Sequence, residues 1–396
     1  MYSDVIPVSL GLPEFRVLDS QDEGQCYRIW AEQIFSDSLC PRCGQRTGAW
    51  SEERWRQVRD LSLLGRPVWL EIRQRRFRCQ GCGRRFWEQF PSVSLRQRQT
   101  RRLQAHLVQS LRGTSVVQAS QVNQIGYRIV ERLYLKLVQQ HYPPSRPLPR
   151  RFGVDEFAPR KGQRYNTVVV ALGVGEVFDV APGRKRASLE ELLKSHPGAS
   201  QVRAVAMDMW EPFYQAVRSV CRRATIVIDR FHVENHTVEA LANVRRRLQR
   251  QKGGGAGKLL KDCREILLTD PQHLTKEQQA KREQILAENP ELARSVELVK
   301  ALNHWYETSP NRDKAQHRLY YWYQRVRQAG LPEFEEVLAM IQRWQAEILN
   351  YFSQWITNGR TEGFNTKIKL IIRLAYGFWN FQHLRARILL ECTHGP

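Results

Sequence analysis

The sequence predicts a mixed α/β protein, in which a sheet domain with a helical insertion follows a cysteine-bearing module and a short helical domain. Two Cys-x-x-Cys pairs occur in the first quarter of the chain. Apolar strand-like runs then alternate with helix-like runs between residues 152 and 232. A long, charged, helix-like stretch separates these runs from the C-terminal segment.

Composition limits the class of partner. The chain has 396 residues, 42% of them hydrophobic and 26% charged, which is typical of a globular protein with a real core. Its 62 lysines and arginines exceed its 40 acids by 22, which favours a polyanion such as nucleic acid. No apolar run approaches the roughly 18 residues of a membrane helix, and no signal peptide is recognisable. We therefore expect a reducing cytoplasm, no membrane partner, and cysteines that are metal ligands or buried thiols.

Residues 1–35 form a lead-in for which the sequence predicts no element. A zinc module follows over residues 36–95, and each of its two cysteine pairs is followed at once by glycine. Four thiolates suit one tetrahedral, structural Zn²⁺. The run RPVWLEIRQRRFRC between the pairs predicts a hairpin that carries the second pair. The expected ligands are Cys40, Cys43, Cys79 and Cys82.

The zinc module also interleaves arginines with aromatic residues. On a strand, alternate residues share a face, so part of this set can point toward phosphates. The alternative is that the charges only maintain solubility. The candidates for DNA contact are Arg73, Arg75, Arg76, Arg84 and Arg85.

Residues 96–142 have a helical pattern. RQTRRLQAHLVQSLRG predicts a helix that ends at Gly113, Thr114 or Ser115 can cap a second, and a third is expected near 127–138. This order fits a helix-turn-helix DNA-binding domain, although three-helix packings of other function share it. The proline-rich, basic stretch 143–151 is predicted to be a linker.

The predicted catalytic core starts at residue 152. RFGVDEF, YNTVVVALGVG and GEVFDVAPG predict three strands, followed by a helix, the strand VRAVAMDM, a second helix and the strand ATIVIDRFHV. This is the order of a ribonuclease-H-like sheet, in which the first and fourth strands are neighbours. It places Asp155 and Asp208 side by side at strand ends. Asp229 follows the fifth strand and is a less favoured alternative for the second acid.

Residues 233–350 are predicted to be a helical insertion, with a flexible GGGAG at 253–257 and an aromatic run at 320–323 that we expect in its core. Residues 351–396 return to the core and carry Glu362 at the start of a basic, helix-like run. Carboxylates suit hard cations such as Mg²⁺ or Mn²⁺. Three of them in a strongly basic chain indicate metal-dependent chemistry on nucleic acid.

Four stretches carry a family resemblance: DEFAPRKGQRYNTVVV (155–170), MDMWEPFYQAV (207–217), IDRFHVENH (228–236) and TEGFNTKIKLIIRLAYGFWNFQHLRARIL (361–389). Through them the chain resembles insertion-sequence transposases of the ISL-three family, which are of the DDE type with an N-terminal zinc finger. The resemblance covers nearly the whole chain. It implies a catalytic set of Asp155, Asp208 and Glu362 that holds two Mg²⁺ or Mn²⁺ ions.

The resemblance also implies an activity. Such an enzyme binds the terminal inverted repeats of its element, cleaves there and joins the 3′ ends to target DNA. A homodimer or higher oligomer on double-stranded DNA is implied, in a prokaryotic cytoplasm and at the nucleoid when bound. Two alternatives stay open: a regulator with an inactive core, and a metal-dependent nuclease without strand transfer.

Further candidates surround these acids. Asp229 and His232 can lie behind the metal ligands, with His232 orienting a phosphate or a carboxylate, although a structural histidine is an equal expectation. Additional basic residues can line DNA, or can form a solvated surface. These are Arg245, Arg246, Lys367, Lys369 and Arg373.

Overall fold

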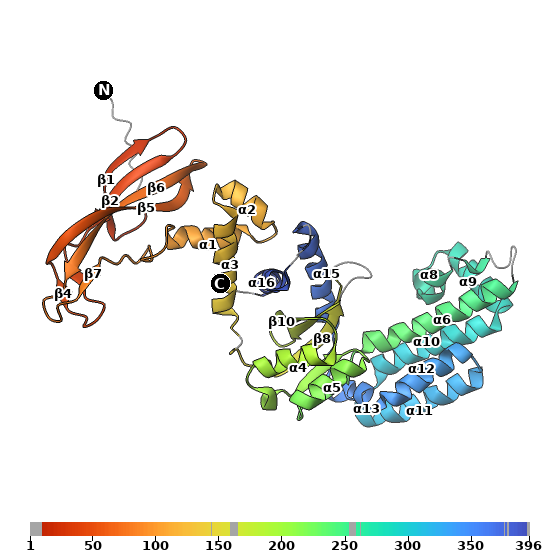
Figure 1. The fold of residues 1–396 in the computed structure, drawn as a ribbon. Helices are drawn as coiled ribbons and strands as arrows, with labels where there is room; N and C mark the ends of the chain where they lie inside the picture. Colours follow the sequence, from red (N-terminus) through yellow and green to blue (C-terminus); the bar gives the residue numbers. More distant parts are fainter. Residues whose placement is uncertain are drawn as a thin grey trace. The chain divides into compact units, whose positions relative to one another are not determined.

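The computed structural model describes residues 10–143, 145–158, 165–252, 259–261, 263–375, 377 and 380–393. They belong to two compact units, Met1–Gln140 and His141–Pro396, and most of their helices and strands are labelled in Figure 1. The GGGAG stretch lies outside the described residues. No helix in the described ranges has both the length and the apolar character needed to cross a membrane.

The first unit is built on a five-stranded sheet with the order β1-β2-β6-β5, to which β7 adds by pairing with β6. β5 and β6 form one long antiparallel hairpin, turned by Leu64 and Gly65, which both have positive φ angles as its tight turn requires. Small strands β3 and β4 flank the first cysteine pair. The strands are β1 (Phe15–Asp22), β2 (Tyr27–Gln33), β3 (Ser38–Leu39), β4 (Arg46–Thr47), β5 (Trp50–Leu63), β6 (Arg66–Arg78) and β7 (Arg85–Trp87).

The hairpin expected between the cysteine pairs is confirmed, and β6 leads directly into Cys79. Strands β1 and β2 fall in the segment for which the sequence predicted no element. They belong to the same sheet as the hairpin, because β2 pairs in parallel with β6. One face of this sheet buries Val58, Leu70 and Ile72 against Phe15 and neighbouring apolar side chains.

Three helices complete the first unit: α1 (Arg101–Ser110), α2 (Val116–Asn123) and α3 (Tyr127–His141). Thr100 caps α1 by accepting the backbone N–H of Leu103, and Ser115 caps α2 in the same way. The three predicted helices are therefore confirmed as elements, with Ser115 as the cap of the second.

The second unit contains a five-stranded sheet of order β10-β9-β8-β11-β12. β9 runs antiparallel to β8 and β10, whereas β11 lies parallel to both β8 and β12. The first and fourth strands are thus neighbours, as predicted. The strands are β8 (Arg151–Phe157), β9 (Asn166–Ala171), β10 (Glu176–Pro182), β11 (Ala204–Met207) and β12 (Thr225–Ile228).

Helices cover both faces of this sheet. Figure 1 shows α4 (Arg186–Ser195) and α5 (Glu211–Val220) on one face, with α15 (Gly359–Leu374) and α16 (Phe381–Glu391) on the other. α15 contacts β8 and β9, and α16 contacts β10. The segment that carries Glu362 therefore returns to the sheet.

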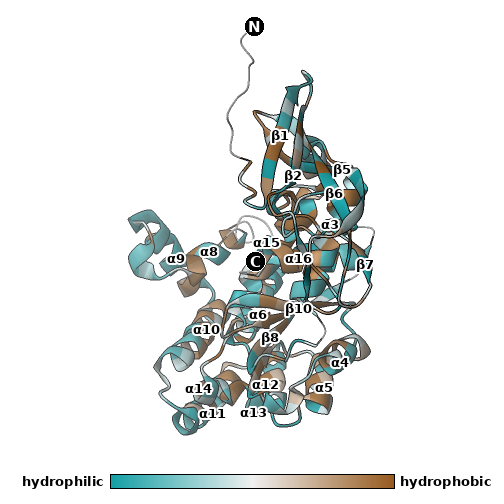
Figure 2. Ribbon diagram, turned by 90° about the vertical axis from the view of Figure 1, so that its left-hand side faces the viewer, coloured by the Kyte–Doolittle hydropathy of each residue, from teal (hydrophilic) through white to brown (hydrophobic). Residues whose placement is uncertain are grey.

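Between β12 and α15 the described chain is helical. Figure 2 shows both hydrophilic and hydrophobic residues along these helices, as expected where one face is buried. They are α6 (Arg230–Lys252), α8 (Arg264–Leu268), α9 (Lys276–Glu288), α10 (Pro290–Thr308), α11 (Arg312–Ala329), α12 (Pro332–Arg343), α13 (Gln345–Leu349) and α14 (Tyr351–Gln354).

The aromatic run at 320–323 is only half in the core. Trp322 and Tyr323 are buried, whereas Tyr320 and Tyr321 are each 57% exposed. The expectation of a wholly buried run was wrong, because consecutive residues of a helix point in different directions and cannot all face one core.

Candidate active site

The four cysteines converge as predicted. Their sulfur atoms all lie within 4.8 Å of one another, with Cys40 Sγ 3.6 Å from Cys82 Sγ and Cys43 Sγ 3.4 Å from Cys79 Sγ. Burial acts to raise the pKa of Cys40, but hydrogen bonds from the backbone N–H groups of Cys43 and Arg42 outweigh it and lower that pKa to about 6. This favours the thiolate of Cys40, the form that binds zinc. In contrast, the hydrogen bond from the Gln45 backbone N–H acts to lower the pKa of Cys43, but contacts with Cys79 and the other cysteines outweigh it and raise that pKa to about 12.

Asp155 and Asp208 meet across two neighbouring parallel strands. Ala206 of β11 lies opposite Gly153 of β8, so two residues further on Asp208 comes beside Asp155. Asp155 is only 8% exposed, and β8 continues two residues beyond it. Its burial and the neighbouring charge of Asp208 together raise the pKa of Asp155 to about 7. A cation placed between the two carboxylates would relieve this repulsion.

Glu362 lies in the exposed first turn of α15. The start of that helix is fixed by Asn358, whose backbone N–H donates to Asp229 Oδ1 at 3.1 Å and whose Nδ2 donates to the Val154 carbonyl at 3.0 Å. Gly153 allows this approach, because a Cβ there would lie 2.2 Å from Asn358 Oδ1. The glycine, the asparagine and Asp229 together dock the helix that carries Glu362 against the strand that carries Asp155.

Asp229 therefore helps to fix the start of α15, by accepting the hydrogen bond from Asn358. It is 2% exposed, and this burial raises its pKa. The hydrogen bond from the Asn358 N–H acts in the opposite direction but does not outweigh burial. The charge of Glu362 also reaches it, so the two carboxylates lie near each other. His232, in the first turn of α6, places Nε2 2.5 Å from Asp208 Oδ1. Burial acts to lower the pKa of His232, but this contact with Asp208 raises it.

The acids suit a divalent cation by their chemistry. They offer hard oxygen ligands, and the Asp208 carboxylate keeps Oδ2 for a cation while Oδ1 lies against His232 Nε2. Among the residues that the structure describes, the four cysteines are the one group of three or more such side chains close enough together to hold a metal ion, so Asp155, Asp208 and Glu362 do not form such a group in this structure.

Two family models match the chain. One, described as "Transposase" and built for the ISL-three group of DDE transposases, matches residues 152–388. The chain belongs to the ISL-three family of transposases. The second model is described as "zinc-finger of transposase IS204/IS1001/IS1096/IS1165" and matches residues 37–82 of this transposase, which contain all four clustered cysteines. The family predicted from the sequence is confirmed, and a structural zinc is supported.

Curated relatives agree with this assignment. The transposase is 28% identical over 380 residues to the "Transposase for insertion sequence element IS1001" of Bordetella parapertussis. The aligned region covers 94% of this chain and 93% of the relative. It is 30% identical over 274 residues to the "Transposase for insertion sequence element IS1557" of Mycobacterium tuberculosis, covering 62% and 61% of the two chains. The similarity to the first relative thus extends over both compact units.

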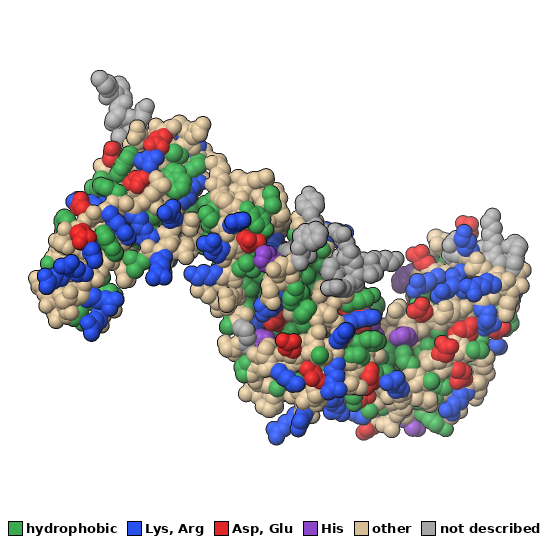
Figure 3. Space-filling view, viewed as in Figure 1, with side chains coloured by type: hydrophobic (Ala, Val, Ile, Leu, Met, Phe, Trp, Pro, Cys, Tyr) green, Lys and Arg blue, Asp and Glu red, His purple; other side chains and the backbone are tan. Residues whose placement is uncertain are grey.

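The predicted DNA-contacting arginines of the transposase's zinc module differ in their surroundings. Arg73 is paired with Glu53, Arg75 with the buried Glu88, and Arg76 with Glu52. By contrast, Arg84 and Arg85 are exposed. Figure 3 shows lysine and arginine side chains over much of the visible face of the first unit.

The basic candidates of the second unit also differ. Arg245 donates to the Leu260 carbonyl, Arg246 to that of Ala242, and Lys367 contacts the carbonyl of Glu391. These contacts are to neutral oxygens, and Arg246 in addition lies 3.9 Å from a carboxylate oxygen of Glu239. Lys369 and Arg373 are exposed one turn apart on α15, the helix that begins with Glu362.

Two residues near the acids were missed from the sequence. Asn365 donates from Nδ2 to Asp155 Oδ2, and Asn358 anchors α15. A signal for Asn365 was present, because it stands three residues after Glu362 and so lies on the same side of a helix. Asn358 gave no signal, since its partners come from distant strands.

Proposed function

We propose that this transposase binds the terminal inverted repeats of its insertion sequence and catalyses metal-dependent strand cleavage followed by transfer of the 3′ ends. The observation that carries the proposal is the meeting of Asp155 and Asp208 on adjacent parallel strands, with the Glu362 helix docked on the same sheet. The strand order β10-β9-β8-β11-β12, with β9 antiparallel, supports a ribonuclease-H-like core.

In this proposal the three acids hold the metal ions. Asp155 would contribute to holding both Mg²⁺ or Mn²⁺ ions, Asp208 to holding one of them and Glu362 to holding the other. When bound, such ions lower the pKa of the attacking water or 3′-hydroxyl and stabilise the leaving 3′-oxygen. Asn365 fixes the orientation of the Asp155 carboxylate by donating to Oδ2, and His232 restrains Asp208. No side chain serves as a nucleophile.

The first unit supplies the proposed DNA recognition. α1, α2 and α3 follow the order of a helix-turn-helix, in which the last helix enters the major groove. Arg84 and Arg85, exposed beside the zinc cluster, add contacts to phosphates, as do Lys369 and Arg373 beside the acids. Because two element ends must be brought together, we propose a homodimer or a larger assembly on DNA.

The decisive experiment measures cleavage and joining of a labelled duplex that carries the element's own end, with Mg²⁺. Wild type is compared with Asp208→Asn and Asp229→Asn. We expect wild type to cut and join, Asp208→Asn to be inactive, and Asp229→Asn to keep part of the activity because an amide oxygen can still accept the Asn358 N–H. An inactive Asp229→Asn with an active Asp208→Asn would show that the second acid is misassigned.

The same assay separates the two rival functions. Cutting without joining to a second duplex would identify a nuclease. Binding of the end without cutting, under Mg²⁺ and under Mn²⁺, would identify a DNA-binding regulator with an inactive core.

A further inference from the structure

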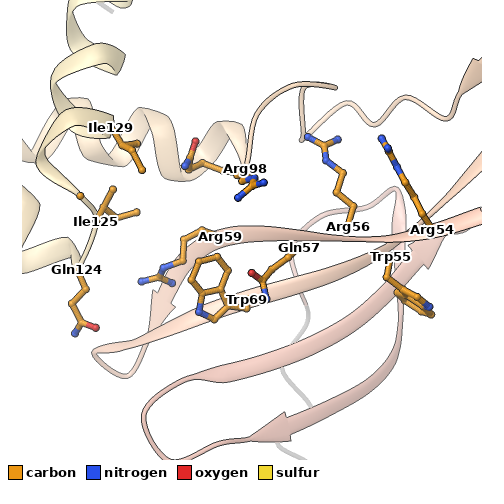
Figure 4. A pocket seen from close by; sticks show the side chains of 12 residues that line it. Arg54, Trp55, Arg56, Gln57, Arg59, Trp69, Arg98, Gln124, Ile125 and Ile129 are labelled. Atoms are coloured by element: carbon orange, nitrogen blue, oxygen red, sulfur yellow. The ribbon is translucent and has the colours of Figure 1, made fainter.

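A basic cleft lies within the first unit, between strand β5 and the turn that leads into α3. Its volume is about 600 Å³. Figure 4 shows Arg54 and Arg56 projecting from the same side of β5, with Arg98 on the segment before α1 and Arg59 directed toward Gln124. None of these residues was a candidate from the sequence. Residues of both the sheet and the three-helix domain line the cleft.

The cleft carries positive charge without compensating acids. Four of its lining residues are arginines, and none is aspartate or glutamate. Arg54 stacks over the Trp87 ring at 4.0 Å and donates to Gln74, while Arg56 donates to the Ser94 carbonyl at 2.6 Å. No ion pair to a carboxylate is found for these arginines among the residues that the structure describes.

Arg59 is the deepest of the four, at 3% exposure, and it donates to the carbonyls of Asp60 and Val68. The neighbouring acid does not form an ion pair with it. The Asp60 carboxylate instead accepts from Thr100 Oγ1 at 2.6 Å and from Arg102 Nε at 2.9 Å.

Electrostatics separates these arginines from others of the same sheet. Burial, followed by the like charge of Arg54, lowers the pKa of Arg56, and burial lowers that of Arg59. In contrast, the hydrogen bonds that Arg28 on β2 donates to the carboxylates of Glu23 and Glu71 raise the pKa of Arg28. The charges of Arg56 and Arg59 are thus destabilised by their surroundings, and an incoming anion would stabilise them.

The arrangement favours an extended polyanion over a small anion. Arg54 and Arg56 lie two steps apart on one side of β5, which at about 3.3 Å per step is roughly 7 Å, and the exposed Arg98 lines the same cleft. Duplex DNA presents one charge per about 1.7 Å of its axis, so arginines spaced in this way can meet more than one phosphate. Ile125, Gly126 and Ile129 border the cleft, which places it beside the first turn of α3.

We propose that this cleft binds the sugar–phosphate backbone of duplex DNA and thereby fixes α3 in the major groove. The inference rests on the proposed function, because it assigns a surface to DNA binding by the same unit. Phosphate contacts position a protein on DNA without reading its sequence. The cleft therefore contributes affinity equally to the element's end and to unrelated DNA.

The test uses the full-length protein and fluorescence anisotropy at several salt concentrations. One labelled duplex carries the element's end, and a second has the same composition in scrambled order. The double variant Arg54→Gln/Arg98→Gln removes two exposed charges of the cleft, so it should leave folding intact, as a thermal melt would verify. The matched control, Arg28→Gln/Arg66→Gln, removes two charges that are paired with Glu23, Glu71 and Asp22.

We expect the cleft variant to bind both duplexes more weakly by the same factor. The slope of its log affinity against log salt concentration should become shallower by about 1.8, because the variant loses two phosphate contacts and each accounts for about 0.9 of the slope. The control should keep the wild-type slope. A cleft variant with wild-type affinity and slope, or one that loses only the element's end, would overturn the inference while the proposed function stands. If wild type itself binds neither duplex, the proposed function fails together with it.

Discussion

Asn365 donates a hydrogen bond from Nδ2 to Oδ2 of Asp155 at 2.7 Å, although the two residues are 210 positions apart in the chain. The bond joins α15 to β8, and therefore joins the helix of the proposed third acid to the strand of the first. The amide oxygen of Asn365 is buried without a partner in the described structure, so the contact with Asp155 is made by the donor side alone. The orientation of the Asp155 carboxylate thus depends on α15.

Replacing Asn365 with alanine should lower the rate of strand cleavage by about 10- to 100-fold, the usual cost of losing a partner that orients a metal ligand. The loss should be partly recovered at higher Mg²⁺, because a poorly oriented Asp155 weakens metal binding. The measurement is the cleavage rate as a function of Mg²⁺ concentration. Thr366→Ala, at the exposed neighbouring position, serves as the control and should match wild type. An equal loss at every Mg²⁺ concentration would argue against an effect through the metal.

Without added Mg²⁺ or Mn²⁺, the protein should lose stability as pH rises. Burial and the charge of Asp208 raise the pKa of Asp155 from 3.8 to about 7, so the folded state binds more protons than the unfolded state in this window. The resulting stabilisation is complete below pH 3.8 and is lost as pH rises through 7. Tm of the zinc-loaded protein, measured without added Mg²⁺ or Mn²⁺ from pH 5 to 8, should fall more for wild type than for Asp155→Asn. Parallel curves for the two proteins would contradict this origin.

One zinc ion per chain should co-purify with the protein, and Cys79→Ser should abolish it. The cluster ties the end of β6 to the turn at Cys40, so zinc loss should cost several kcal/mol and lower the first unit's Tm on the order of 10 °C. Zinc content by atomic emission and a thermal melt check both points. Cys26→Ser is the matched control, because Cys26 lies outside the cluster and donates to Glu23. Zinc retained by Cys79→Ser at wild-type stoichiometry would refute the ligand set.

Arg75 and Arg84 should separate into a structural and a DNA-contacting residue. Arg75 donates to Glu88, whose side chain is fully buried, and to the Phe35 carbonyl at 2.6 Å. Arg75→Ala leaves that carboxylate unpaired and should cost about 3–5 kcal/mol of stability. Arg84→Ala, at an exposed position, should change stability by less than about 0.5 kcal/mol and weaken DNA binding instead. Urea denaturation and anisotropy distinguish the two, and a stable Arg75→Ala protein would contradict the assignment.

The sheet of the second unit could be predicted because its strands are short apolar runs separated by turn signals. β9 is buried along its whole length, and a strand of that kind is recognisable without alignment. By contrast, β1 is exposed at every position after Phe15, so it has no alternating pattern to detect. It becomes a strand by pairing with β2, which in turn pairs with the distant β6.

The sequence could predict the site residues whose side chains can bind metal by themselves, but not those whose role depends on their contacts. Acids at strand ends and cysteine pairs can be recognised in a sequence as candidate metal ligands. Gly153 and Asn358 cannot, because the role of each depends on its contact with the other in the folded protein. The same holds for Arg73 and Arg75. Their sequence pattern suggested DNA contacts, but the carboxylates that pair with them come from other strands and could not be located beforehand.

The helical segment between β12 and α15 has a consequence for synthesis. Asp229 and Asn358, which are hydrogen-bonded in the folded protein, lie 129 positions apart in the chain, so the first unit, Asp155 and Asp208 are synthesised long before Glu362. Under the proposed function, a ribosome-bound or truncated chain would occupy an element's end while lacking the third ligand. Incomplete copies would thus compete with finished enzyme, and the element would restrain its own movement when translation is interrupted.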